Sequence, residues 1–191
     1  MNINPKKIND LIYGKGVDSH NRFPFFMKNS ETLNDAEYWY GLGKAYSDSD
    51  NSYKWRSLVK AAFSAKRLQK QYLMTTEEIK GLKKLGKTVT IYRGMTVKER
   101  RSGKFGVSWT LDKRVAQFFA DKYPRNYSTH HEPKIVHSLN VNRRDILALL
   151  NDRQEQEVIY LRRPFKTAYL MISKHIKTYI KEADYYYASF Y

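Results

Sequence analysis

Two glutamates, Glu155 and Glu157, stand two positions apart in this chain, directly before the strand-forming residues Val158, Ile159 and Tyr160. Because side chains on a strand alternate between its faces, both carboxylates would share one face, with their Cα atoms about 6.5–7 Å apart. Like charges held that close repel each other, so the pair has no structural benefit unless a cation or a substrate binds it. The pair is therefore a candidate catalytic site, and the alternative is a chance occurrence.

A second motif, Tyr92-Arg93-Gly94, ends a predicted strand. The arginine offers a planar fork of donors that suits a phosphate, and the glycine allows close approach to the backbone. The alternative is an arginine that makes an ordinary surface ion pair.

The third motif, Ser108-Trp109-Thr110, follows Phe105-Gly106-Val107 and also has strand character. Alternation would direct the two hydroxyls to one face, where they could meet a carboxylate from a neighbouring strand. The alternative is a pair of hydroxyls on a half-exposed strand without a function.

Taken in chain order, the three motifs resemble the arginine, serine and glutamate signature of the ADP-ribosyltransferase superfamily, especially the small transferases of bacteriophages and bacteria. The resemblance extends to GVSWTLDKRVAQFFA, where a helix with Ala and Phe follows the serine strand, and to DILALLNDRQEQEVI before the glutamates. It covers roughly residues 87–162. It implies an α+β fold of two packed, mostly antiparallel sheets that form an NAD cleft, flanked by an N-terminal helical lobe.

The resemblance also implies roles for individual residues. Arg93 would hold a phosphate or the nicotinamide-side ribose of NAD, and Ser108 would brace the site and position the catalytic glutamate. Glu157 would be the catalytic acid and Glu155 the acceptor-side residue. Glu at position 155, rather than Gln, resembles the arginine-modifying branch, so the implied acceptor is an arginine side chain of a host protein. The implied NAD-binding residues are Tyr92, Arg93, Gly94, Ser108, Trp109 and Thr110.

One position departs from the family's pattern. The usual Ser-Thr-Ser is Ser-Trp-Thr here. We expect Trp109 to point away from the face that carries the hydroxyls of Ser108 and Thr110, so that both hydroxyls can still serve the site.

The implied reaction explains why carboxylates are needed. Cleavage of the bond between ribose and nicotinamide builds positive charge on the sugar, as in glycoside hydrolysis. Glu157 would stabilise this charge by accepting a hydrogen bond from the ribose 2′-hydroxyl. Glu155 would hold the acceptor guanidinium and take its proton. Nicotinamide is a good leaving group, so NAD is expected as the substrate and no metal is required.

The elements that must position these residues follow from hydrophobic spacing. We expect an irregular lead-in over 1–30 that packs by the aromatics of FPFF, and helices over 31–46 and 51–73. A capping-box pattern at Thr75 and Glu78 starts a third helix. Strands begin near residue 87, interrupted by a helix that Asp112 caps and a helical turn in RRDILALLN. We interpret 1–191 as one domain, with a mainly helical lobe over 1–86, a sheet-rich core over 87–191 and a helix in the last residues.

Charge and composition limit the partners. The chain has 191 residues, 35 Lys and Arg against 19 Asp and Glu, and a formal charge of +16. Such an excess attracts polyanions, which favours an acidic or nucleic-acid-associated target protein. The basic face of the predicted 51–73 helix could contact RNA or DNA, so the alternatives are a non-catalytic nucleic-acid-binding protein and a transferase that modifies nucleic acid.

The absence of cysteine and of a long apolar run further restricts the class of protein. Without cysteine, disulfides and thiolate metal sites are excluded. Together with the absence of an apolar segment of about 18 residues, this favours a cytoplasmic protein without a membrane partner. His130 and His131 are adjacent and point apart, so we predict no metal site there.

Overall fold

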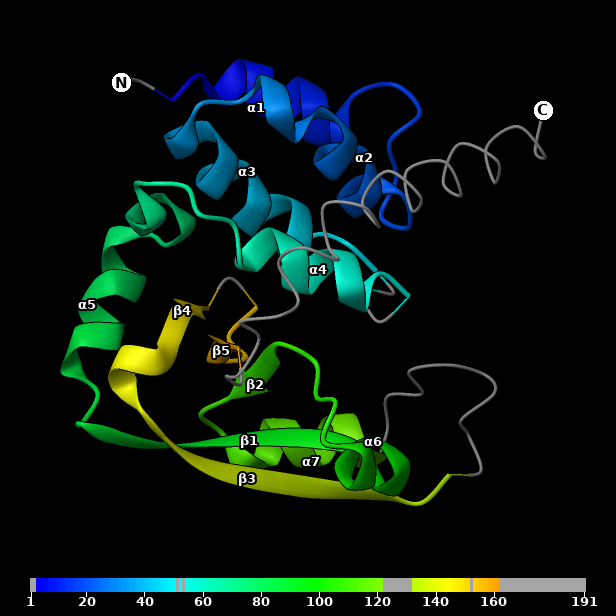
Figure 1. The fold of residues 1–191 in the computed structure, drawn as a ribbon, viewed down its shortest axis with the longest axis vertical. Helices are drawn as coiled ribbons and strands as arrows, with labels where there is room; N and C mark the ends of the chain where they lie inside the picture. Colours follow the sequence, from blue (N-terminus) through cyan, green and yellow to red (C-terminus); the bar gives the residue numbers. More distant parts are fainter. Residues whose placement is uncertain (1–2, 51, 53, 122–131, 152, 162–191) are drawn as a thin grey trace. The chain divides into compact units, whose positions relative to one another are not determined.

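The computed structural model describes residues 3–50, 52, 54–121, 132–151, 153–161. Its chain forms two compact units, one within 1–73 and one within 74–162 (Figure 1). The change from helices to strands falls near residue 87, as we expected, since the first strand starts at Thr88. The boundary between the two units lies earlier, between Leu73 and Met74, because the helix that starts at Thr76 belongs to the sheet-containing unit. His130, His131 and the predicted C-terminal helix lie outside the described residues.

The first unit is helical. Its α-helices are α1 (Pro5–Tyr13), α2 (Arg22–Asn29), α3 (Asp35–Ser47) and α4 (Arg56–Phe63), and its 3-10 turns are η1 (Ser30–Thr32) and η2 (Lys70–Leu73). The expected irregular lead-in over 1–30 was wrong. The side chain of Asn4 caps α1 by accepting from the amide of Lys7, and Pro5 suits the first helical position, so a helix starts where we had expected irregular structure.

Aromatic side chains form the core of this unit, as expected. Phe23 and Phe26 of the FPFF stretch are fully buried. Phe23 meets Tyr46 edge-to-face at 6.3 Å between ring centroids, and Tyr46 meets Phe63 at 5.1 Å. These contacts join α2 and α4 to α3, and such pairs add about 0.5–1.5 kcal/mol each beyond the area they bury.

The predicted helix over 51–73 was wrong beyond Phe63. Helix α4 ends there, Gln69 takes a left-handed backbone with φ of 61°, and Leu68 is 76% exposed instead of facing the core. The apolar spacing of Leu68 and Tyr72 is therefore not a continuation of the helix stripe.

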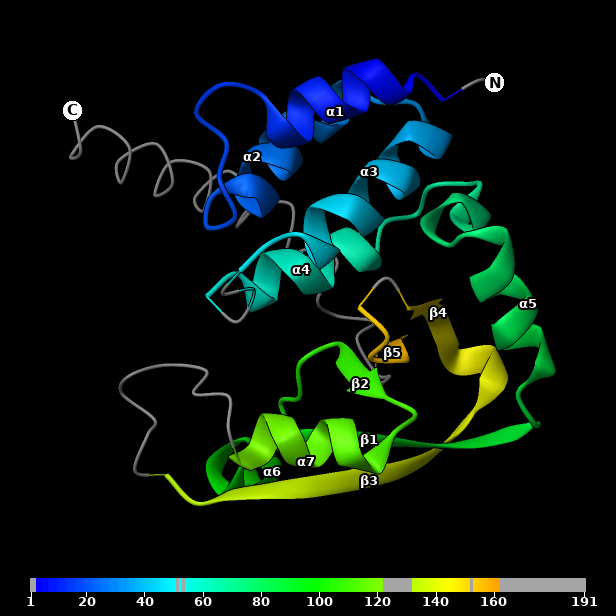
Figure 2. The ribbon, with the colours of Figure 1, turned by 180° about the vertical axis from the view of Figure 1, so that it is seen from behind.

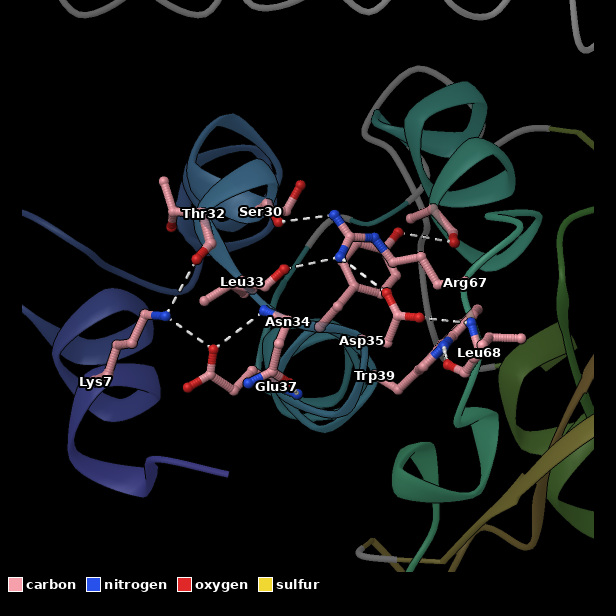
Figure 3. A network of polar contacts seen from close by, with 12 residues as sticks. Lys7, Ser30, Thr32, Leu33, Asn34, Asp35, Glu37, Trp39, Arg67 and Leu68 are labelled. Atoms are coloured by element: carbon pink, nitrogen blue, oxygen red, sulfur yellow. Dashed lines mark hydrogen bonds and ion pairs between the residues drawn. The ribbon is translucent and has the colours of Figure 1, made fainter. Parts of the chain in front are cut away.

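A polar network around Arg67 and Leu68 stabilises the non-helical segment that follows α4 (Figure 3). The guanidinium of Arg67 donates to the carbonyls of Leu33 at 2.8 Å and Ser30 at 3.2 Å, and lies 4.5 Å from the centre of the Tyr38 ring. The Asp35 carboxylate accepts from the amide of Leu68 at 2.9 Å. These bonds satisfy carbonyls at the end of α2 and η1, so Arg67 serves the fold and not a basic outer face.

The second unit contains one five-stranded sheet in the order β3-β1-β2-β5-β4. Its strands are β1 (Thr88–Thr96), β2 (Ser108–Thr110), β3 (Lys134–Asn142), β4 (Ile146–Leu150) and β5 (Glu157–Tyr160), and all pairings are antiparallel. The expected α+β class is confirmed. Within the described residues, however, we find one sheet where we expected two, because the pairing of Tyr92 with Thr110 joins β1 to β2.

Helices α5 (Thr76–Lys84), α6 (Val97–Ser102) and α7 (Lys113–Asp121) complete this unit. The predicted capping box of α5 is present, with Thr75 accepting from the Glu78 amide and Glu78 accepting from the Thr75 amide. Helix α7 lies along β1 and β3 in both views (Figures 1 and 2). The Asp112 side chain caps α7 as expected by accepting from the amide of Arg114 at 2.8 Å.

The predicted helical turn in RRDILALLN was largely wrong. Only Arg143–Asp145 form a single 3-10 turn, η4, and Ile146–Leu150 form β4. Pairing of Leu149 with Val158 of β5 overrides the helix-like spacing of the leucines. Together with Val89, Ile91, Met95 and Trp109, these residues form the apolar core on one face of the sheet.

No helix among the described residues is long and apolar enough to cross a membrane.

A buried carboxylate in the first unit gives a testable pH dependence. Glu37 accepts from Lys7 Nζ at 2.8 Å and from the amide of Asn34 at 3.2 Å (Figure 3). Burial raises the pKa of Glu37, but the hydrogen bond from Lys7, the bond from the Asn34 backbone and the charge of Lys7 together outweigh it. The pKa of Glu37 therefore lies below its usual value.

We expect Glu37→Gln to lower the free energy of unfolding at neutral pH by about 1 kcal/mol, since it removes the charge and keeps the bond to Asn34. Because the folded pKa is the lower one, the difference from wild type is complete above the ordinary Glu pKa of about 4.3 and disappears as pH falls through the folded value. Urea unfolding at a series of pH values measures it. The exposed Glu31→Gln is the control, and a difference that grows toward acid would contradict this assignment.

Candidate functional site

One pocket in the second unit is lined by every site residue that we predicted from the sequence. The space between its walls, part of which is open to solvent, is about 270 Å³. The nominated residues at its wall are Tyr92, Arg93, Gly94, Ser108, Trp109, Thr110, Glu155 and Glu157. Three segments that are far apart in the sequence thus meet at one place.

The register of the sheet brings these segments together. Tyr92 of β1 pairs with Thr110 of β2, and Thr110 pairs in turn with Glu157 of β5. Cross-strand partners project from the same face of a sheet. The hydroxyl of Thr110 and the carboxylate of Glu157 therefore share a face, as predicted. Val115, Ala116 and Phe119 of α7 add an apolar wall to the pocket.

Both glutamates line the pocket, but only Glu157 does so from a strand. Strand β5 begins at Glu157, and Gln156 has a left-handed backbone with φ of 46°, so Glu155 precedes the strand. The prediction that strand alternation puts both carboxylates on one face was wrong. The Glu155 carbonyl instead accepts from Thr110 Oγ1 at 2.7 Å, and this bond holds the residue at the pocket.

The loop between β4 and β5 carries Glu155 in a strained backbone. Gln154 and Gln156 have φ of 56° and 46°, which for residues with a Cβ costs about 1–2 kcal/mol each. Hydrogen bonds maintain this conformation: Glu78 Oε1 accepts from the Asn151 amide at 2.6 Å, and Asn151 Oδ1 accepts from the Gln156 amide at 3.2 Å. Strained loops of this kind concentrate at functional sites.

A third charged residue joins the glutamates. Arg153 Nη2 lies 3.4 Å from Glu155 Oε2 and 3.7 Å from Glu157 Oε2. The Glu157 side chain is 8% exposed, whereas the Arg153 side chain is 51% exposed. One arginine thus spans the two carboxylates from the solvent side and offsets their repulsion.

Arg93 is buried, not part of a surface ion pair. Along β1 it takes the same face as Val89 and Ile91, which belong to the apolar core, and its side chain is 6% exposed. A charge in such a position needs partners. Arg93 Nε donates to Glu99 Oε1 at 3.0 Å, and Nη1 donates to the Ser108 carbonyl at 2.6 Å. These bonds tie β1 to β2 and α6, and the role of Arg93 as a ligand of phosphate or ribose stays a prediction.

Two glycines permit these close contacts. A Cβ on Gly94 would lie 2.3 Å from the Ala116 carbonyl oxygen and 2.6 Å from the Ala120 amide nitrogen, so the glycine admits the backbone of α7. A Cβ on Gly106 would lie 2.5 Å from the guanidinium of Arg93. We expected Gly94 to make room for a ligand, and in this structure it makes room for a helix.

Trp109 points away from the hydroxyl face, as we expected. It is 2% exposed and belongs to the apolar core. Its ring meets Phe105 edge-to-face at 5.6 Å and Tyr160 at 6.3 Å. The departure from Ser-Thr-Ser therefore adds an anchor for β2 and leaves Ser108 and Thr110 on the other face.

Sequence reasoning missed several residues that build the site. Glu99 is the buried partner of Arg93. The Thr96 side chain positions Glu99 by accepting from the Glu99 amide at 3.0 Å. Glu99 follows Arg93 by six positions, and this spacing is not a recognisable motif for an ion pair. Arg153 was adjacent to the glutamate pair, and the spacing Arg-x-Glu-x-Glu could have indicated it.

Among the described residues, no group of three or more His, Cys, Asp or Glu side chains could hold a metal ion. The hydrogen bonds from the Arg114 side chain and backbone lower the pKa of Asp112, which caps α7.

The buried pair gives a stability prediction. Glu99→Ala leaves the guanidinium of Arg93 without its carboxylate and should lower the free energy of unfolding by about 3–5 kcal/mol. Glu99→Gln, which retains an acceptor for Arg93 Nε and for the Gly106 amide, should cost less. Urea unfolding measures both against Glu77→Ala, whose side chain is 80% exposed. A loss no larger than that of the control would show that Arg93 does not depend on Glu99.

Comparisons of the chain with protein-family models, with curated proteins and with solved structures give no match.

Proposed function

We propose that this protein is an NAD-dependent mono-ADP-ribosyltransferase that transfers ADP-ribose to arginine side chains of target proteins and releases nicotinamide. The observation that supports the proposal most is the shared pocket. Residues 92–94, 108–110, 155 and 157, which were nominated from a resemblance to that superfamily, line one cavity. A chance likeness of three short motifs gives no reason for them to converge in space.

The environment of Glu157 suits the stabilisation of a developing positive charge. Its side chain is 8% exposed, and in a partly dehydrated site an oriented carboxylate interacts with charge more strongly than in water. Its backbone is fixed by pairing with Thr110 on one side and Leu150 on the other. Under the proposal, this carboxylate accepts a hydrogen bond from the 2′-hydroxyl of the nicotinamide-side ribose.

The surroundings of Glu155 differ from those of Glu157 and support a different role. Its side chain is 27% exposed, more than that of Glu157, and it already contacts a guanidinium, that of Arg153. Under the proposal, Glu155 orients the incoming arginine and takes its proton as the new bond to ribose forms, because a protonated guanidinium is a poor nucleophile.

The brace formed by Arg93 supports both roles. By bonding to the Ser108 carbonyl, it fixes β2, and β2 carries Thr110, which holds the backbone of Glu155. Ser108 faces the pocket on the same side as Thr110 and remains our candidate for bracing the catalytic glutamate.

Under the proposal, Glu157 is needed for both activities. Glu157→Gln preserves size and removes the charge, so both ADP-ribose transfer and NAD hydrolysis should fall by at least about 10²-fold. Release of nicotinamide from NAD, with and without a small guanidine acceptor, measures both rates. Glu77→Gln, at a side chain that is 80% exposed, is the matched control. Full activity in Glu157→Gln would rule out this site.

Under the proposal, Glu155 is needed for arginine transfer but not for NAD hydrolysis. Glu155→Gln should remove arginine transfer but retain part of the NAD hydrolysis, because water needs no carboxylate to hold and deprotonate a guanidinium. The ratio of transferred ADP-ribose to released nicotinamide gives the result. An equal loss of both activities in the two variants would show that the roles are not divided in this way.

The acceptor class requires its own experiment. Labelled NAD is incubated with the protein and a host lysate, and the labelled product is then digested with protease or nuclease. Label that is released by protease supports a protein acceptor, whereas label released by nuclease supports transfer to nucleic acid.

The net charge of +16 supports a second candidate, a non-catalytic nucleic-acid-binding protein. The 51–73 segment gives it less support than we expected, because α4 ends at Phe63 and Arg67 is engaged in the polar network. Binding to RNA or DNA that falls steeply with salt, together with no release of nicotinamide, would favour this candidate.

A further inference from the structure

The position of Arg153 resembles that of an acceptor. Its guanidinium lies 3.4 Å from Glu155 and 3.7 Å from Glu157, in contact with both carboxylates to which the proposed reaction assigns a role. The side chain comes from the strained loop between β4 and β5, and half of its surface is exposed.

The fold does not need this contact. Hydrogen bonds from Thr110 Oγ1 to the Glu155 carbonyl, and from the Asn151 amide to Glu78, hold the loop without Arg153. The contact with Glu157 is the longer of the two, at 3.7 Å, and a ribose hydroxyl can replace it as the partner of that buried carboxylate. The guanidinium can therefore leave Glu157 and keep its contact with Glu155.

Resting on the proposed function, we infer that Arg153 is an internal acceptor, which the protein modifies with ADP-ribose in the absence of a target. When a ribose hydroxyl takes the carboxylate of Glu157, Arg153 loses the longer of its two contacts and keeps the shorter one, to Glu155. Its guanidinium then stands beside the carboxylate that deprotonates an acceptor, close to the sugar held by the neighbouring carboxylate.

The step balances with NAD as the only co-substrate. The bond between ribose C1′ and the nicotinamide nitrogen breaks, and its electron pair leaves with neutral nicotinamide. A bond forms between C1′ and a terminal nitrogen of Arg153. One proton passes from the guanidinium to Glu155, and the substituted guanidinium keeps its positive charge.

Modification would also limit the enzyme. An ADP-ribose on Arg153 adds a bulky anionic group at the acceptor side of the pocket, so it should exclude further acceptors. Transfer to other arginines should therefore slow with time as Arg153 is modified.

The test incubates the full chain with NAD alone and locates ADP-ribose by peptide mass spectrometry. We expect the label on the peptide that contains Arg153, at a rate per molecule that does not change with protein concentration. Arg153→Lys should reduce the label at least about tenfold and abolish the slowing of transfer to agmatine, a small guanidine acceptor, because lysine lacks the guanidinium. Arg144→Lys, at another exposed arginine of the same unit, should behave as wild type.

The outcomes separate this inference from the proposed function. Agmatine modified while Arg153 stays unmodified would overturn the inference and leave the proposed function standing. Label on Arg153 whose rate per molecule rises with protein concentration would also overturn it, since that requires modification between molecules. No release of nicotinamide and no transfer to agmatine would overturn both.

Discussion

The buried pair of Arg93 and Glu99 is the interaction on which the site depends. Strands β1 and β2 share only the pairing of Tyr92 with Thr110, so the backbone ladder alone joins the β1–β3 pair weakly to the other three strands. Arg93 adds a hydrogen bond to the Ser108 carbonyl, and Glu99 neutralises the charge in the apolar surroundings. Without this brace, the segments that carry the hydroxyls and the carboxylates would not be held in one register.

Strand β2, which Arg93 fixes, in turn positions both glutamates. Thr110 pairs with Glu157 through the backbone and holds Glu155 through its hydroxyl. One carboxylate is thereby fixed by a strand and nearly buried, and the other is fixed by a strained loop and more exposed. This difference in burial and support is the physical basis for assigning the sugar to Glu157 and the guanidinium to Glu155.

The sequence predicted the members of the site better than their arrangement. Alternation along β2 correctly separated Trp109 from the hydroxyls, because a three-residue strand in a sheet keeps its period. It failed for Glu155, because Gln156 adopts a left-handed backbone that its residue type does not signal. Glu99 and Arg153 were missed because their importance depends on contacts that appear only after folding.

The same contrast holds for the fold. The capping residues Thr75, Glu78 and Asp112 act locally, and their helices appear where they were expected. The leucines of β4 have helical spacing, but pairing with β5 decides their structure. Arg67 has the spacing of a basic helix face, but its guanidinium donates to the carbonyls of Ser30 and Leu33 instead. Helix caps, which act within a few residues, therefore predicted structure correctly. Contacts with distant parts of the chain decided the structure where the spacing of side chains had suggested a helix.

The most direct test is a crystal structure of the protein with a non-hydrolysable NAD analogue whose nicotinamide-side ring keeps its 2′-hydroxyl. Our account predicts that the analogue occupies the pocket between β1, β2, α7 and the loop before β5, with the 2′-hydroxyl within hydrogen-bonding distance of the Glu157 carboxylate. The nicotinamide-side ring should also displace Arg153 from Glu157. An analogue bound elsewhere, or a pocket that stays empty at a concentration that saturates other NAD-binding enzymes, would contradict it.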